Sequence, residues 1–144
     1  MNTINVKNTK KFLKDFLLCG LIGWCNECFW TGLSSIKEHK DKRLLCQTSV
    51  WMFPIYGMAA MLSPISTWIS GANTLIRGGV YTICIFAVEF LSGSFLKKLH
   101  VCPWDYSKAK LNICGVIRLD YAPAWFALGL LYEKVLGGRK AGIE

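Results

Sequence analysis

Long stretches without charge dominate this sequence. From Leu44 to Ile76 it runs for 33 positions without Asp, Glu, Lys or Arg, and Phe16–Ile36 and Gly78–Leu96 contain one charged residue each. About 20 apolar residues suffice for a helix to cross the hydrocarbon core of a bilayer. Because the charges gather in short runs between these stretches, the chain is predicted to be an integral membrane protein.

The composition agrees with a membrane protein and argues against nucleic acid as a partner. Hydrophobic residues make up 53% and charged residues 18% of the 144 residues, whereas soluble domains usually carry about 25% charged residues. The formal net charge of +8 could attract phosphate. The Lys and Arg side chains, however, flank apolar segments and do not cover a folded polar surface. We expect membrane lipids, and no nucleic acid, as partners.

Four membrane-spanning helices in a single membrane domain, residues 1–144, are predicted from the apolar stretches, so the fold class is all-α. The spans are expected at about 16–36, 49–70, 78–96 and 119–136. Pro54 and Pro64 should kink the second span, and a turn is expected at Gly71–Thr74. The fourth span has only Tyr121–Tyr132 as its uncharged part, so it could instead lie in the membrane interface.

The first span begins like a signal peptide, with four lysines before an apolar run: Lys7, Lys10, Lys11 and Lys14. The run continues to Ile36, beyond the roughly 7–15 apolar residues of a signal peptide, and no A-x-A-like cleavage site follows. A retained helix is therefore expected.

Loop charge leaves the orientation of the chain open. With four spans, one side of the membrane would carry eight Lys and Arg residues and the other side nine. The positive-inside rule compares such counts, and this difference is too small to choose a side.

Glu27 and Glu89 each stand near the middle of a predicted span. An ionised side chain there costs about 2.5–3.5 kcal/mol on insertion scales, and such residues usually face a bundle interior or a water-filled cavity. Small residues at helical spacing share the face of each acid: Gly20, Gly23 and Thr31 with Glu27, and Thr82 and Gly93 with Glu89. Both acids are predicted to point inward and to form one shared site. Two interpretations stay open: a proton-exchanging or cation-binding site, or protonated acids that only bridge helices.

The longest polar stretch, Lys97–Asp120, separates the last two predicted spans. It contains Trp104-Asp105-Tyr106-Ser107, followed by Asn112. Trp and Tyr favour the headgroup level of a membrane. This aromatic loop is therefore expected to rest on the membrane surface or to fold back into the protein.

Seven cysteines cannot all pair within one chain, because the number is odd. Cys25 and Cys28 form a C-x-x-C. One such pair does not make a four-ligand zinc site, and no strand–helix context suggests a thioredoxin-like motif. Packed thiols are the favoured interpretation and soft-metal handling is the alternative, so no metal or other cofactor is assigned.

Nucleotide-binding and hydrolase motifs do not occur in the sequence. There is no G-x-x-x-x-G-K-[ST], so the chain cannot bind ATP through a P-loop, and there is neither G-x-S-x-G nor H-E-x-x-H. We therefore do not expect an enzyme. If the chain takes part in ATP-driven transport, a separate subunit must hydrolyse the ATP.

Several short motifs follow one another between residues 12 and 136. They are Gly23-Trp24-Cys25-Asn26-Glu27, Pro54-Ile55-Tyr56-Gly57, Glu89-Phe90-Leu91-Ser92-Gly93, Trp104-Asp105-Tyr106-Ser107, Asn112-Ile113-Cys114-Gly115-Val116-Ile117 and Trp125. In this order they resemble the "putative ABC-transporter type IV" permeases, a family of CmpB-like small bacterial membrane proteins related to the transmembrane 229 proteins. One departure is Val116, where the resemblance would place a basic residue after the glycine.

The resemblance implies a polytopic permease component of a transporter. Trp24 and Tyr56 would join the two acids in a substrate or proton site, and the loop motif would comprise Trp104, Asp105, Tyr106, Ser107 and Asn112. A separate ATPase subunit is the implied partner, and a homo-oligomer is an alternative assembly.

Three function classes follow from these observations. The leading hypothesis is a multi-pass permease component in the cell membrane, which the inward polar faces favour. The alternative is a non-transporting membrane module that binds lipid or a partner protein through the aromatic loop. The third is a membrane-embedded enzyme that uses Glu27, Glu89 and Asp105 as acid–base groups.

Overall fold

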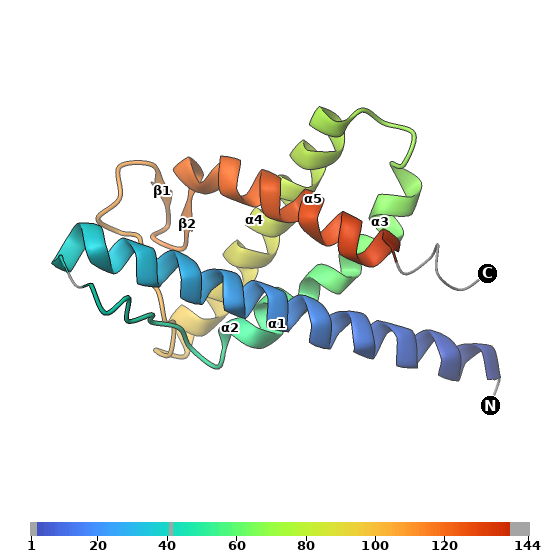
Figure 1. Ribbon diagram of the computed structural model, residues 1–144, viewed down its shortest axis with the longest axis horizontal. Coiled ribbons are helices and arrows are strands. Elements are labelled where there is room, and N and C mark those ends of the chain that lie inside the picture. Colours follow the sequence, from blue (N-terminus) through green and yellow to red (C-terminus); the bar gives the residue numbers. More distant parts are fainter. Residues whose placement is uncertain (1–2, 41, 139–144) are drawn as a thin grey trace. The chain divides into compact units, whose positions relative to one another are not determined.

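The computed structural model of the chain describes residues 3–40 and 42–138 and is mostly helical (Figure 1). The chain divides into two compact units, Met1–Met58 and Ala59–Glu144, and each unit is described by itself. The all-α fold class is confirmed for the described residues, apart from a small β-hairpin before the last helix.

The first unit consists of one long helix and the chain that returns along it. Helix α1 covers Thr3–His39, so it contains the whole predicted span 16–36. Residues 42–51, here called the return segment, run back beside α1 without regular structure (Figure 1). The short helix α2, Met52–Gly57, then packs on α1. The rings of Trp24 and Phe53 meet edge to face with centroids 5.9 Å apart, which helps to hold α2 in place.

The predicted second span, 49–70, is not one kinked helix. It is divided into α2, the 3₁₀ turn η1 (Met58–Met61) and α3 (Leu62–Trp68). Pro54 and Pro64 each occupy the third position of an α-helix. In the first turn of a helix the N–H that proline lacks would have no partner within the helix. The prolines therefore stand at the starts of two short helices, and the prediction of one helix over 49–70 with kinks at Pro54 and Pro64 was wrong.

The second unit contains α3 together with α4 (Thr74–Lys98) and α5 (Ala122–Gly138). Asn73 caps α4, because its Oδ1 accepts a hydrogen bond from Ile76 N at 2.9 Å. This cap lies in the turn that the sequence predicted. Between α4 and α5, strands β1 (Asn112–Ile113) and β2 (Ile117–Arg118) pair antiparallel, and the 3₁₀ turn η2 (Leu119–Tyr121) follows. The predicted spans 78–96 and 119–136 are thus both helical.

Glycines bring α4 and α5 close together. A side chain on Gly78 would collide with the ring of Phe126, and one on Gly129 would collide with Cβ of Tyr81. Tyr81 is completely buried. Small residues permit such close approach of two helices. In each helix a glycine leaves the space that an aromatic residue of the other helix occupies.

Helix α4 is polar on its inner face and apolar on its outer face. Thr82, Glu89 and Gly93 are all buried, which confirms the inward face predicted for this helix. Large apolar side chains on the opposite face are 54–69% exposed: Ile76, Ile83, Leu91 and Phe95. A helix on the surface of a water-soluble protein has the reverse polarity. The arrangement therefore indicates lipid around α4.

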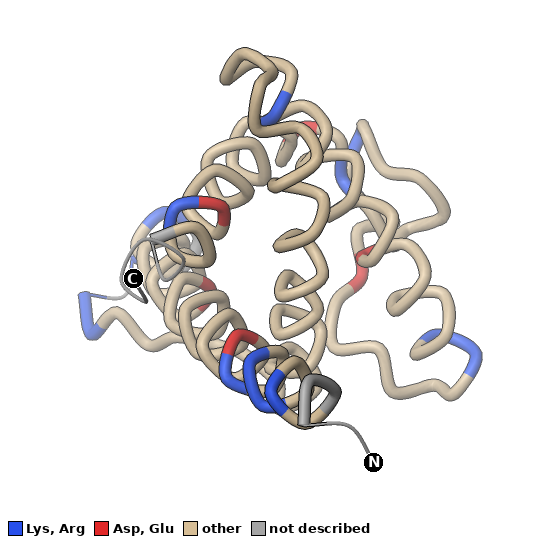
Figure 2. Tube along the Cα trace, turned by 90° about the vertical axis from the view of Figure 1, so that its right-hand side faces the viewer, with Lys and Arg blue, Asp and Glu red and all other residues tan. Residues whose placement is uncertain are grey.

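Two helical stretches are long and apolar enough to cross a membrane by length and composition, Val6–Lys37 in α1 and Thr74–Lys98 in α4. Only 22% and 28% of their most apolar windows are buried, which is unlike the core helix of a soluble protein. Figure 2 shows that long parts of the helices carry no charge. At 1.5 Å per residue, α4 is about 37 Å long and α5 is about 25 Å long. The hydrocarbon core of a bilayer is about 30 Å thick.

Replacing Gly129 with Ala should destabilise the protein, because the added methyl group must displace Cβ of Tyr81, which is anchored to the backbone of α4. Such overpacking costs about 1–3 kcal/mol, whereas the gain in helix propensity is at most about 1 kcal/mol. The control is Gly79→Ala in α4, where a methyl group meets nothing within 4 Å. Thermal unfolding in detergent should give a lower Tm for Gly129→Ala and an unchanged or higher Tm for Gly79→Ala. Equal shifts would contradict the close contact.

Candidate functional site

The return segment covers a polar face of α1. The Glu27 carboxylate accepts a hydrogen bond from Thr48 Oγ1 at 3.1 Å. Thr31 Oγ1 accepts one from the backbone N–H of Gln47 at 3.0 Å and donates to the backbone oxygen of Glu27 at 2.9 Å. These bonds fasten the return segment to α1 beside the acid.

Two glycines let other backbone approach α1. A side chain on Gly20 would meet the carbonyl oxygen of Phe53 at 2.9 Å, and one on Gly32 would meet that of Leu44 at 3.0 Å. Gly23, between them, is buried. The face of α1 that the sequence predicted to point inward is therefore the face that contacts α2 and the return segment.

Trp24 and Tyr56 lie in the same unit as Glu27. Trp24 stands three residues before Glu27 on α1, a spacing that makes the two side chains neighbours on the helix surface. Its indole nitrogen is buried and has no hydrogen-bond partner among the residues that the structure describes. Tyr56 is a half-buried residue of α2. An unused donor is thus available near the first acid.

Glu89 is the buried acid of the second unit. It is 9% exposed, and its Oε2 has no hydrogen-bond partner within residues 3–40 and 42–138. The side chain of Trp125, from α5, interacts with this carboxyl group, yet Trp125 Nε1 makes no hydrogen bond of good geometry in the described part of the chain. A buried carboxyl oxygen and a buried indole N–H therefore lie next to each other between α4 and α5, without a hydrogen bond of good geometry between them.

This arrangement can take up a proton or a small polar group. An ionised carboxylate only accepts hydrogen bonds, a protonated one also donates, and an indole N–H only donates. Leaving a buried polar group unpaired costs about 1–3 kcal/mol, so a water molecule or a ligand that pairs with both groups would be favoured. Glu27 and Glu89 belong to different units, and the expected site shared by the two acids stays a prediction.

A second polar cluster near the start of α4 was not predicted. Arg77 Nε lies 3.3 Å from Glu133 Oε1 of α5, and the buried Tyr81 interacts with the same carboxylate. The sequence offers one signal for this cluster. Arg77 stands near the beginning of α4 and Glu133 near the end of α5, and antiparallel packing brings these positions together.

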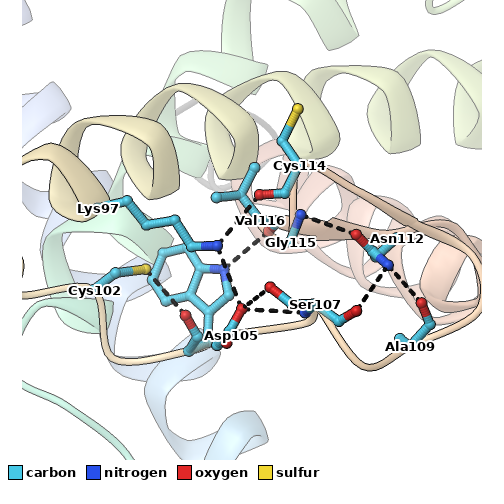
Figure 3. A network of polar contacts seen from close by, with 10 residues as sticks. Lys97, Cys102, Asp105, Ser107, Ala109, Asn112, Cys114, Gly115 and Val116 are labelled. Carbon is cyan, nitrogen blue, oxygen red and sulfur yellow. Dashed lines mark hydrogen bonds and ion pairs between the residues drawn. The ribbon is translucent and has the colours of Figure 1, made fainter.

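The loop after α4 is held by its own polar contacts (Figure 3). Asp105 Oδ1 accepts hydrogen bonds from the Ser107 backbone N–H at 3.1 Å and the Ser107 hydroxyl at 2.5 Å, and Lys97 Nζ donates to it at 3.3 Å. The Ser107 bonds, and after them Lys97, hold the pKa of Asp105 below its usual value. Because the Asp105 side chain is 65% exposed, the acid shapes a surface loop and is not a buried reactive group.

Trp104 ties this loop to α4. Its indole Nε1 donates to the carbonyl oxygen of Val116 at 2.9 Å (Figure 3). A side chain on Gly93 of α4 would meet the Trp104 ring at 2.9 Å and Val116 at 3.1 Å. At Trp104 the aromatic loop therefore folds back into the protein, which is one of the two placements that the sequence allowed.

Asn112 organises the tight turn of the hairpin. Its Oδ1 accepts from the Gly115 N–H at 3.0 Å, and its Nδ2 donates to Ala109 O at 2.5 Å. Cys114 and Gly115 both have positive φ, 53° and 64°, as the two central residues of a type I′ turn require. A side chain on Gly115 would also collide with Ser107 Oγ. Glycine is therefore the residue that this turn accepts.

A row of aromatic rings leads from the loop to α5. Arg118 pairs with Asp120 and lies 4.6 Å from the centre of the Tyr121 ring. Tyr106 meets Tyr121 with centroids 5.8 Å apart, and Tyr121 meets Trp125 at 6.1 Å. The row ends at the indole beside the buried acid, so the loop and the acid belong to one connected structure.

The chain matches a known protein family over most of its length. The family described as "Putative ABC-transporter type IV" matches residues 15–139. The chain belongs to this family. The resemblance seen in the motifs is thereby confirmed. The family description names an ABC-transporter component, and together with two membrane-capable helices it indicates a membrane protein. No solved structure matches the chain.

This member of the type IV family has an apolar residue where the motif was expected to continue with a basic one. Val116 is 1% exposed, so a charged side chain there would be buried against α4. Lys97 of α4 instead donates to the carbonyl oxygen of Cys114 at 3.2 Å. The cation beside this turn therefore comes from the helix.

Replacing Asn112 with Ala should loosen the loop, because it removes the bonds to Gly115 and Ala109. At about 1 kcal/mol for each of the two bonds, local opening should become roughly thirtyfold more frequent. Limited trypsin digestion in detergent, followed by mass spectrometry, should then show faster cleavage after Lys108 and Lys110. The control is Asn26→Ala, at an exposed position of α1, which should cleave like the parent chain. Unchanged cleavage in Asn112→Ala would mean that the loop does not depend on this side chain.

Proposed function

We propose that the chain is a multi-pass permease component of an ABC transporter in the cell membrane, and that a separate ATPase subunit drives it. Family membership supports the transporter context. The observation that carries the permease role is the buried Glu89 carboxyl group with its unused Oε2. Ionisable residues within membrane helices are costly, and they mark pathways for substrates, ions or protons.

The proposed topology has four crossings, made by α1, the α2–α3 stretch, α4 and α5. The lengths of α1 and α4 support two of them directly. Helix α5 has 17 residues, about 25 Å at the rise of an α-helix. Local thinning of the bilayer accommodates helices that are shorter than its hydrocarbon core, at a modest cost.

In this proposal the return segment lines a polar cavity beside α1. It contacts α1 between Glu27 and Gly32, within the proposed first span, and its backbone there has no regular structure. Irregular backbone at membrane depth is tolerated only where protein buries it or where it lines a water-filled cavity. Such a cavity suits a permease, in which Glu27 and Thr48 would contact the passing solute or ion.

In this proposal the chain is not an enzyme. Asp105 was the third acid of the enzyme hypothesis, but it is exposed and its pKa is lowered. A carboxylate that is ionised at neutral pH has no proton to give as a general acid. The proposal therefore places ATP hydrolysis in the separate subunit.

One observation favours the alternative of a non-transporting membrane module. Leu111, Ile113 and Leu119 of the hairpin region are 40–55% exposed. Leu119 N donates to Leu111 O at 2.9 Å, so two of these side chains stand on adjacent strands. Such a patch could bind lipid or a partner protein.

Purification of the tagged chain from its native membranes in mild detergent should recover a second subunit that contains a P-loop, in a fixed ratio. The complex should hydrolyse ATP, and the chain freed of that subunit should not, because its own sequence has no P-loop. Mass spectrometry and phosphate release measure the two results.

Recovery without any P-loop subunit would overturn the ATP-driven permease. If the purified chain then binds liposomes of anionic lipid, and Leu111→Ser with Leu119→Ser abolishes that binding, the membrane module is the better description.

Replacing Glu89 with Gln should leave the fold intact but reduce ATP turnover by the complex at least tenfold, because Gln keeps the shape of Glu and cannot titrate. ATP hydrolysis, complementation of a strain that lacks the chain, and Tm in detergent measure the effect. The control is Lys134→Gln, which also replaces a charged side chain with Gln but at an exposed position of α5, and it should retain activity. If Glu89 only bridges helices, Gln will be almost neutral and Glu89→Leu alone will lower Tm. Full activity of Glu89→Gln would thus remove Glu89 from the transport pathway.

A further inference from the structure

Two thiols meet where the return segment lies against α1. Cys28 is a half-buried residue of α1, and Cys46 is an exposed residue of the return segment. The Cys28 thiol is within hydrogen-bonding reach of the Cys46 thiol. Both cysteines are free. The transport proposal assigns neither of them a role.

Two contacts of the return segment hold Cys46 at this turn of α1. Its neighbour Gln47 donates a hydrogen bond to Thr31 Oγ1 at 3.0 Å. Cβ of Cys46 lies 3.9 Å from the place that a Cβ on Gly32 would occupy. Cys28 comes four residues before Gly32, and side chains at that spacing are neighbours on one helical face. The two thiols are therefore placed together by backbone contacts, independently of their own interaction.

We propose that Cys28 and Cys46 are a redox-active pair that closes as a disulfide between α1 and the return segment. The oxidant is a small-molecule disulfide such as oxidised glutathione. The exposed Cys46 thiolate attacks one sulfur of that disulfide, which forms a mixed disulfide and releases the first small thiol. The Cys28 thiolate then attacks the Cys46 sulfur and releases the second small thiol. The protein gives up two protons and two electrons, and the oxidant takes them up as two thiols.

Cys25 is the competing partner for Cys28, because the two form the C-x-x-C of α1. In a helix the Cβ atoms of residues three apart are about 5–6 Å from each other, whereas a disulfide needs Cβ atoms about 3.5–4.5 Å apart. Closing that pair would distort α1 in its middle. Cys46 belongs to a segment without helical hydrogen bonds, so it can move the remaining distance. The geometry therefore selects Cys46.

The disulfide would fix the return segment to the polar face of α1. Glu27 directly precedes Cys28, and Thr48 follows Cys46 by two residues. In the reduced state the hydrogen bonds to Glu27 and Thr31 hold the return segment, and these can open. In the oxidised state a covalent bond fixes it. The redox state would thus control access of solvent to Glu27, whether or not the chain transports a solute.

Trypsin separates the two cysteines, so the test can use the unmodified full chain. Cleavage after Lys14, Lys37, Arg43 and Arg77 gives the peptide 15–37, with Cys19, Cys25 and Cys28, and the peptide 44–77, with Cys46 alone. The purified protein in detergent is treated with oxidised glutathione, free thiols are blocked with iodoacetamide, and the digest is analysed without reductant. We expect the two peptides joined and lacking two hydrogen atoms, with fragmentation locating the bond at Cys28. Reductant should separate them.

Two serine variants test which cysteine pairs with Cys46, and one further product would contradict the pairing. Cys28→Ser should abolish the linked peptide and leave Cys46 as a stable mixed disulfide with glutathione, whereas the matched control Cys25→Ser should form the link normally. A bond that fragmentation locates at Cys25 or Cys19 would overturn the pairing. So would an unmodified chain in which Cys46 becomes glutathionylated without any link. Fragmentation of the unmodified chain decides the pairing even where a serine variant does not fold.

Discussion

The second unit depends on the inverted polarity of α4, whose outer face is apolar while its polar residues point inward. In a lipid environment no water reaches the outer face, and each inward polar group must find its partner within the protein. Thr82 does so by donating to Gly78 O at 2.8 Å, and Ser92 by donating to Val88 O at 2.7 Å. Both hydroxyls are thus satisfied by their own helix. Glu89 is different, because backbone oxygens of the helix only accept hydrogen bonds and an ionised carboxylate has no proton to donate to them. The unused Oε2 is therefore a consequence of placing an acid on this face, and it is the feature on which the proposed permease role rests.

The need to pair polar groups within the protein also shapes the first unit. Helix α1 has 37 residues, about 55 Å, which exceeds the whole bilayer with its headgroups, about 40–45 Å. At the average tilt of about 20° for membrane helices, part of α1 stands outside the membrane. The return segment has few regular backbone bonds of its own, and it satisfies Gln47 and Thr48 through side chains of α1. Gly32 makes this possible, since any side chain there would press on the carbonyl oxygen of Leu44. Irregular backbone such as that of the return segment is tolerated at membrane depth only where it faces protein or water.

Charge segregation was enough to predict the helices at 16–36 and 78–96, because lipid-length apolar runs have few alternatives to a helix. Small residues beside each acid also predicted which faces would be packed. The sequence could not predict the return segment, since its attachment to α1 rests on hydrogen bonds such as Thr48 to Glu27, 21 residues apart, and no periodicity marks it. The position of Pro54 in a first turn was missed for a related reason. An uncharged run hides where one helix ends and the next begins. Likewise Trp125 was noted only as a motif residue, because its place beside Glu89 depends on how α5 packs.

The loop between α4 and α5 determines how α5 packs beside Glu89. The motif residues of the loop make hydrogen bonds within the loop or its hairpin: Trp104, Asp105, Ser107 and Asn112. The segment richest in motifs therefore has a structural role, which is to hold the loop in shape. Its effect reaches the acid through Tyr121, which meets Tyr106 of the loop on one side and Trp125 on the other. Tyr121 and Trp125 are four residues apart and share one face of the chain as it enters α5. Holding Tyr121 against the loop therefore fixes the rotation of α5 about its own axis. That rotation determines whether the Trp125 N–H is directed at Glu89 or at lipid. A change that loosens the loop would then alter the surroundings of the buried acid without touching it, so the loop and the acid form one structural unit.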